Sequence, residues 1–85
     1  MKRKQLFDLW YITFQYGGDS FGAISYGHYA FPHNEFDYNY CLRTQMKNDK
    51  RESMPVITFA VKTRDSISIE ETEKTQENIK LLQQE

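Results

Sequence analysis

The chain of 85 residues has room for one domain with one modest core, so a deep enzyme cleft is not expected. Six Phe, six Tyr and one Trp offset a hydrophobic fraction of only 39%, and the core should therefore be aromatic. A single cysteine excludes a secreted domain held together by internal disulfides and favours a reducing, cytoplasmic compartment. The sequence lacks an apolar stretch of membrane-spanning length, so we expect neither membrane insertion nor export.

An aromatic β-strand is expected at residues 6–16. Ile12 and Phe14 alternate there with Tyr11 and Thr13, which is the pattern of a strand with one face toward the core. This strand is the first half of a predicted β-hairpin.

The hairpin turn is expected at residues 17–19, Gly-Gly-Asp, which tolerate positive φ angles, and the second strand at residues 20–31. We expect a three-residue loop, because that register places Ile12 opposite Ile24 and brings the apolar residues together. It also turns Tyr29 toward the same outward face as Tyr11.

A helix is predicted at about residues 35–48, with Asn34 as its N-terminal cap. Tyr38, Leu42 and Met46 recur at four-residue spacing and form its expected apolar stripe.

A third strand is expected to open at Met54, and a final helix is predicted at about residues 69–83. Ser68 and Glu71 have the spacing of a capping box at the start of that helix. Its middle is polar and acidic, so it should pack on the sheet only in part, or lie free until it meets a partner.

The predicted fold class is α+β, a three-stranded antiparallel sheet with two helices in the order ββαβα. Residues 1–64 form the expected core. Residues 65–85 form an acidic helical segment, either part of the same domain or a partner-binding extension.

Catalytic and metal-binding patterns are weak in this sequence. His33, Asp37 and Cys41 have four-residue spacing, but they supply three ligands where structural zinc sites use four. Cys41 is expected in mid-helix, with no cation or helix N-terminus to activate its thiol, and packing explains it more simply. The glycines lie in a hairpin and not between a strand and a helix, so no phosphate-binding loop is predicted. We therefore expect no enzyme activity, cofactor or metal.

Two kinds of interaction surface remain open. Sheet aromatics with nearby basic residues are typical of single-stranded nucleic-acid binders, although the net charge of −1 and the acidic tail weigh against this. An aromatic sheet with free edges and an acidic helix also suits a protein partner. The candidate interaction residues are Tyr11, Tyr29, Arg43, Lys47, Arg51, Glu70, Glu73 and Glu77.

Several short segments carry a resemblance across most of the chain, and they are Tyr11-Ile12-Thr13-Phe14-Gln15-Tyr16, Phe21-Gly22, Phe31-Pro32, Val56-Ile57-Thr58 and Ile69-Glu70-Glu71. In these the sequence resembles a group of small uncharacterised proteins from phages and mobile elements of Bacteroides-like bacteria. It departs from that group at residues 48–54, where a glycine-containing loop would be expected. The resemblance implies a non-enzymatic accessory protein that binds another protein, with a homodimer and inhibition of a host defence complex as options.

Overall fold

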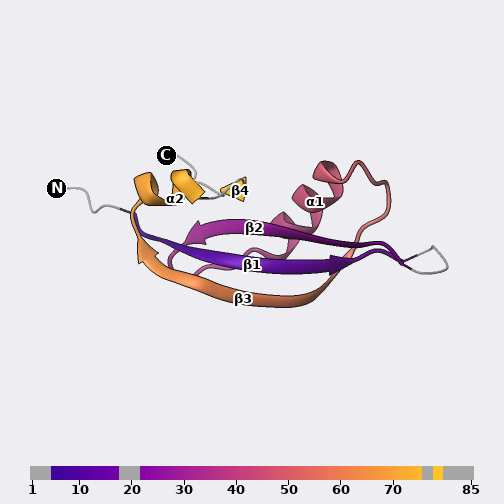
Figure 1. The fold of residues 1–85 in the computed structure, drawn as a ribbon, viewed down its shortest axis with the longest axis horizontal. Coiled ribbons are helices and arrows are strands. Elements are labelled where there is room, and N and C mark those ends of the chain that lie inside the picture. The colour runs from indigo at the N-terminus through magenta and orange to yellow at the C-terminus, as the bar shows by residue number, and fades with distance from the viewer. Residues whose placement is uncertain (1–4, 18–21, 76–77, 80–85) are drawn as a thin grey trace.

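The computed structural model describes residues 5–17, 22–75 and 78–79. The elements follow the order β1 (Phe7–Gln15), β2 (Ile24–Pro32), α1 (Tyr38–Asn48), β3 (Val56–Ile67), α2 (Ile69–Thr75) and β4 (Asn78–Ile79). The strands form one sheet in the order β3-β1-β2-β4, and β1 lies in the middle of its three long strands (Figure 1). The α+β class is confirmed. The predicted three-stranded antiparallel sheet is wrong, because β4 adds a fourth strand that pairs in parallel with β2.

The hairpin register differs from the expected one. Ile12 lies opposite Gly27, and Ile24 lies opposite Gln15, so the pairing is shifted by three residues. The backbone N–H of Tyr16 donates to the carbonyl of Ala23 at 2.8 Å, so the turn is longer than residues 17–19. An odd shift exchanges the two faces of the second strand.

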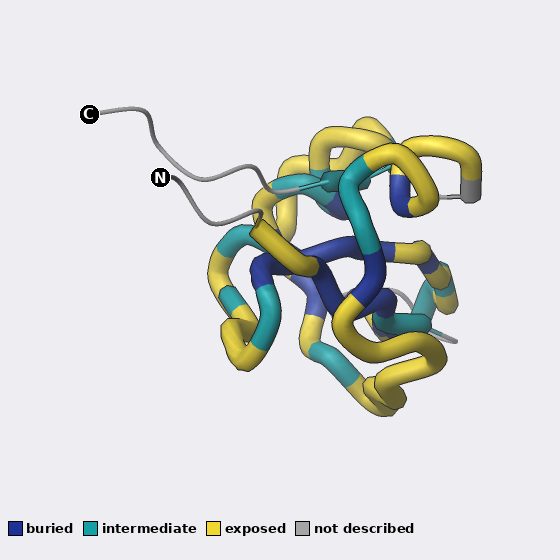
Figure 2. Tube along the Cα trace, turned by 90° about the vertical axis from the view of Figure 1, so that its left-hand side faces the viewer, coloured by how far each residue is buried: buried dark blue, intermediate teal, exposed yellow. Residues whose placement is uncertain are grey.

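The main core lies between one face of the β1–β2 hairpin and α1. Ile12 and Phe14 of β1 and Tyr29 and Phe31 of β2 are fully buried there, beneath Cys41 and its neighbours on α1. Figure 2 shows the buried stretches of chain in the middle of the molecule, with exposed stretches around them. The alternation predicted along the first strand is confirmed.

Helix α1 begins three residues later than predicted. Asp37 is its N-cap and accepts a hydrogen bond from the backbone N–H of Tyr40 at 3.0 Å. Asn34 is not the cap, because it has a left-handed φ of 67° and its N–H donates to Asp8. The buried residues of α1 are Cys41, Leu42 and Gln45, so the predicted stripe was right at Leu42 and wrong at Tyr38, whose side chain is exposed.

The C-terminal segment is not one long helix. Strand β3 runs through to Ile67, across the expected division between residues 64 and 65. The Ser68 half of the predicted capping box is confirmed, since the N–H of Glu71 donates to Ser68 Oγ at 3.2 Å, while the Glu71 carboxylate pairs with Arg64. Helix α2 ends at Thr75, and β4 follows. The polar helix has little apolar surface to extend over the sheet, whereas Ile79 packs with Leu9, Ala30 and Ile67 in a second small core.

Within residues 5–17, 22–75 and 78–79, no helix has the length and apolar character needed to cross a membrane.

Candidate functional site

The sheet face opposite α1 is covered at one end only. The second core around Leu9 closes the end beneath α2 and β4. The strand pairings place the remaining side chains of this face side by side. We name this surface the open face, and it comprises Tyr11, Thr13 and Gln15 of β1, Ile24, Tyr26 and His28 of β2, and Val56, Phe59 and Val61 of β3.

The open face is apolar and exposed. The exposed fractions are 79% for Ile24, 62% for Tyr26 and 53% for Phe59. Large apolar side chains are seldom gathered in the open on a small protein unless they contact something else. The face therefore has the composition of a binding surface.

Three rings form a cluster at the centre of the open face. The Tyr11 centroid lies 6.0 Å from that of Tyr26 and 5.2 Å from that of His28, and Tyr26 and His28 are 6.2 Å apart. The rings are tilted or edge-on to one another, so they form an uneven aromatic surface and not a parallel stack.

Strand β3 is exposed on both faces of the sheet. Every residue from Val56 to Ser66 is exposed except the half-buried Ile57. The reason is that α1 packs over β1 and β2 and does not extend across β3. The pairing of β3 with β1 shifts register between Leu9 and Trp10 and again between Thr13 and Phe14. Between these two shifts, residues Phe59–Lys62 of β3 pair regularly with β1.

The structure separates the interaction residues predicted from the sequence. Tyr11 lies on the open face, but Tyr29 is fully buried, and its predicted outward position is wrong. The hydroxyl of Tyr29 donates to Gln45 Oε1 at 2.7 Å, and burial raises the pKa of that phenol. Tyr29 is a core residue and offers no ring to a partner.

The basic and acidic candidates lie elsewhere. Arg43 and Lys47 are exposed on α1, in the layer on the far side of the sheet from Tyr11. Arg51 lies in the loop after α1, with its guanidinium carbon 4.9 Å from the centroid of the Tyr16 ring. Glu70 and Glu73 are exposed on α2, and Glu77 lies outside the described residues. The structure does not bring these charges together with the exposed aromatic rings.

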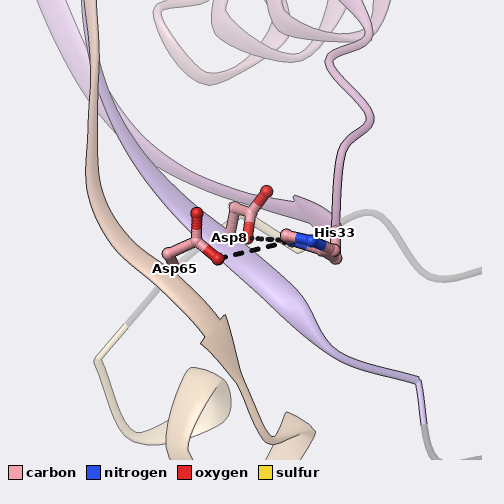
Figure 3. Close-up of side chains that lie close together, drawn as sticks. All are labelled: Asp8, His33 and Asp65. Carbon is pink, nitrogen blue, oxygen red and sulfur yellow. Dashed lines mark hydrogen bonds and ion pairs between the residues drawn. The ribbon is translucent and has the colours of Figure 1, made fainter.

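A polar cluster joins β1, the turn after β2 and the end of β3. Figure 3 shows Asp8, His33 and Asp65, whose candidate ligand atoms all lie within 4.8 Å of one another. His33 Nδ1 lies 2.9 Å from Asp8 and 3.5 Å from Asp65. The Lys62 ammonium lies 3.4 Å from Asp8 and 3.1 Å from Asp65. Lys62 thus places one positive charge between the two carboxylates, where a metal ion would otherwise lie.

The same cluster contains a Ser, a His and an Asp, but their geometry is not that of a catalytic triad. Ser66 Oγ and Asp8 Oδ1 both approach the same ring nitrogen, Nδ1 of His33, at 3.2 and 2.9 Å. A triad needs the nucleophile on one ring nitrogen and the orienting carboxylate on the other. The groups act instead as a clamp between strands.

Asp8 is the centre of this clamp and is fully buried. It accepts hydrogen bonds from the backbone N–H groups of Asn34 and Ser66, both at 3.0 Å. Burial alone would raise the pKa of Asp8, but the hydrogen bonds from His33, Asn34 and Ser66 and the charge of Lys62 outweigh it and lower the pKa to about 2. Asp8 is therefore ionised at neutral pH and holds three segments together.

A polar pocket of about 540 Å³ lies at the outer edge of β2, between that strand, α1 and β4. Its lining includes the buried Gln45, whose amide nitrogen donates to Ser25 Oγ at 2.8 Å and to the Tyr26 carbonyl at 3.2 Å. Asn78 donates to the His28 carbonyl at 3.1 Å. These amides bond to the protein itself, so the pocket wall is a set of internal hydrogen bonds.

Cys41 is fully buried, and burial raises the pKa of its thiol to about 12. The thiolate needed for nucleophilic attack is disfavoured at this position. His33 bonds to Asp8, and the four-residue spacing of His33, Asp37 and Cys41 does not place them along one helix face, because α1 starts after Asp37.

Sequence reasoning missed Tyr26, His28 and Phe59 as parts of one surface. The available signal was the alternation of the second strand, Ile24, Tyr26 and His28, read in the register that the structure adopts. Comparison of the chain with models of protein families, with curated proteins and with solved structures gave no match.

Proposed function

We propose that this protein is a non-enzymatic binding module that contacts another protein through the open face. The observation that supports it is the gathering of apolar and aromatic side chains on three neighbouring strands, where the exposed Tyr26 and Phe59 lie beside the half-buried Tyr11. Aromatic side chains in such a patch are the residues that contribute most binding energy at protein interfaces.

The charge of the open face favours a protein over a nucleic acid. None of its residues is Lys, Arg, Asp or Glu. A site for single-stranded nucleic acid needs cations beside the stacking rings, because the phosphate backbone supplies most of the affinity. Arg43 and Lys47 lie across the sheet on α1 and do not meet that need. The resemblance to phage and mobile-element proteins makes a bacterial host protein the first class of partner to test.

The test is affinity capture from a lysate of a Bacteroides-like bacterium, with and without nuclease, using wild-type protein and two variants. Tyr26→Asp places a charge at an exposed position of the open face, and Arg43→Glu is a matched charge change on α1. We expect a defined protein to be captured by the wild type and by Arg43→Glu, to survive nuclease and to be lost with Tyr26→Asp.

Two outcomes contradict the proposal. Capture that Tyr26→Asp leaves unchanged would place binding on another surface. Recovery of nucleic acid, or loss of the captured protein after nuclease, would favour the nucleic-acid alternative, and a steep dependence of binding on salt would then follow. Thermal melts of both variants establish that each is folded.

A further inference from the structure

The two edges of the sheet differ in whether their outward backbone groups already have hydrogen-bond partners. The outer edge of β2 is closed by β4, which pairs at Tyr29 and Ala30, and by two side-chain amides. Gln45 bonds to the carbonyl of Tyr26, and Asn78 bonds to the carbonyl of His28. Among the described residues, β3 has β1 as its only strand neighbour, and no described element lies beyond β3 in Figure 1.

From Val56 to Val61 the open edge of β3 has no charged side chain, although charged residues usually protect such an edge. Lys62 is the one charged residue in the stretch from Val56 to Lys62. Its ammonium bonds to Asp8 and Asp65 and lies 5.8 Å from the centroid of the Trp10 ring, so it is held back over the sheet. The edge is therefore a row of backbone groups flanked by apolar side chains.

The sequence of β3 is complementary to itself when two copies run antiparallel about Ala60. Phe59 and Val61, which share the open face, then lie opposite each other twice, with Ala60 opposite Ala60 on the other face. The basic end of each strand meets the uncharged end of the other, since Lys62 lies opposite Thr58 and Arg64 opposite Val56. A parallel pairing in register would instead place Lys62 beside Lys62, which is unfavourable.

We propose that two copies of this chain pair along β3, antiparallel and centred on Ala60, to form one continuous sheet. The contact is isologous, so each copy supplies the same strand. The pairing also joins the two open faces at Phe59 and Val61. It forms whether or not the open face binds another protein, because it uses the strand edge.

Cysteine cross-linking tests both the contact and its register. Opposed residues of antiparallel strands have Cα atoms about 4.5–5.5 Å apart, within the range that a disulfide spans. Ala60→Cys should therefore form a covalent dimer under mild oxidation. Val56→Cys is the matched control, because the proposed register separates the two copies of residue 56 by eight positions along the strands. Wild-type Cys41 is buried and should not contribute.

We expect roughly tenfold more covalent dimer from Ala60→Cys than from Val56→Cys, because the paired thiols have a high effective concentration. A mixture of Phe59→Cys and Val61→Cys should cross-link better than either variant alone. Light scattering of the wild type should show a mass that rises with concentration toward twice 10.2 kDa, and Val61→Lys should hold it at 10.2 kDa.

Three results would overturn the proposal. One is a wild-type mass that stays at 10.2 kDa at every concentration. Another is a dimer in which Ala60→Cys and Val56→Cys cross-link equally, which would place the contact elsewhere. The third is capture of the open-face partner with no self-association, which would leave the proposed function standing and remove the dimer.

Discussion

Strands β2 and β3 both pair with β1, but they differ in how far their side chains are buried. In β2, Tyr29, Ala30 and Phe31 are fully buried, whereas in β3 only Ile67 is buried. Both strands are rich in β-branched and aromatic residues. The difference comes from α1, which covers the hairpin and leaves β3 exposed on both faces except at the half-buried Ile57. Strand propensity thus indicates where a strand forms, and the placement of a helix decides which strand becomes core and which becomes surface.

The sharpest way to test this contrast is to truncate one ring in each strand. Phe31 packs against Tyr29, Phe36 and Tyr40, with centroids 5.4–6.1 Å away, so Phe31→Ala should lower the free energy of unfolding by about 4 kcal/mol. Phe59→Ala at the exposed position should cost less than about 1 kcal/mol. Urea denaturation at low protein concentration measures both. Equal losses would mean that β3 is buried in the folded chain.

The next effect concerns the clamp that ties the end of β3 to the hairpin. Asp8→Asn leaves one oxygen for two backbone donors, those of Asn34 and Ser66, and should cost about 3 kcal/mol. Asp65→Asn, whose parent side chain is half exposed, is the control and should cost far less.

The contribution of Asp8 to stability should also depend on pH. The pKa of Asp8 falls from 3.8 to about 2 on folding, so its ionised form stabilises the protein above pH 3.8 and that contribution is lost as the pH falls through about 2. The shift corresponds to on the order of 2 kcal/mol. Urea denaturation between these pH values should show a shallower pH dependence for Asp8→Asn than for the wild type. Identical slopes would show that Asp8 is not the group responsible.

A smaller effect is expected on the covered side of the hairpin. A Cβ at Gly27 would lie 2.6 Å from Gln45 Oε1 and 2.7 Å from a ring carbon of Tyr29. Gly27→Ala should therefore push the Tyr29–Gln45 hydrogen bond apart and cost about 2 kcal/mol. Gly17→Ala, where a Cβ meets nothing within 4 Å, is the control in the same thermal melts. Two equal melts would show that the contact beneath α1 relaxes freely.

The smallest effect belongs to α2. Ser68→Ala removes the cap on the Glu71 N–H and should cost about 1 kcal/mol. Restoration by Ser68→Asp, a residue that also caps helices, would tie the loss to the cap. Thermal denaturation is the measurement, and an unchanged melt for Ser68→Ala would mean that α2 adds little to the fold.

Local patterns in the sequence predicted the elements that local chemistry controls. The alternation of Ile12 and Phe14 and the Ser68 cap each depend on neighbours in the chain, and the structure confirms them. The register of the hairpin depends on residues far apart. Gly27 opposes Ile12 because only a glycine leaves room for Gln45 and Tyr29 above it, and those residues lie on separate elements.

Predictions for the candidate site were likewise right where neighbouring residues decide the structure and wrong where distant residues decide it. Tyr11 was placed correctly from the first strand alone. Tyr29 was placed on the wrong face because a shift of three residues turned the second strand over. Asn34 looked like a helix cap by its residue type, but the buried carboxylate of Asp8, 26 residues earlier, takes its N–H instead. No local pattern carries such a contact.

The amide caps on β2 also set a limit on how far an assembly of this chain could grow. If β3 is the joining edge, the strands left at both ends of a pair are those that Gln45, Asn78 and β4 already occupy. In the described part of the chain, two carbonyls of each outer β2 then already accept side-chain hydrogen bonds, and Tyr29 and Ala30 pair with β4, so little of that edge is left for a third copy. The side-chain amides of Gln45 and Asn78 would thus block the addition of further copies, so that the assembly stops at a dimer and does not extend into a filament.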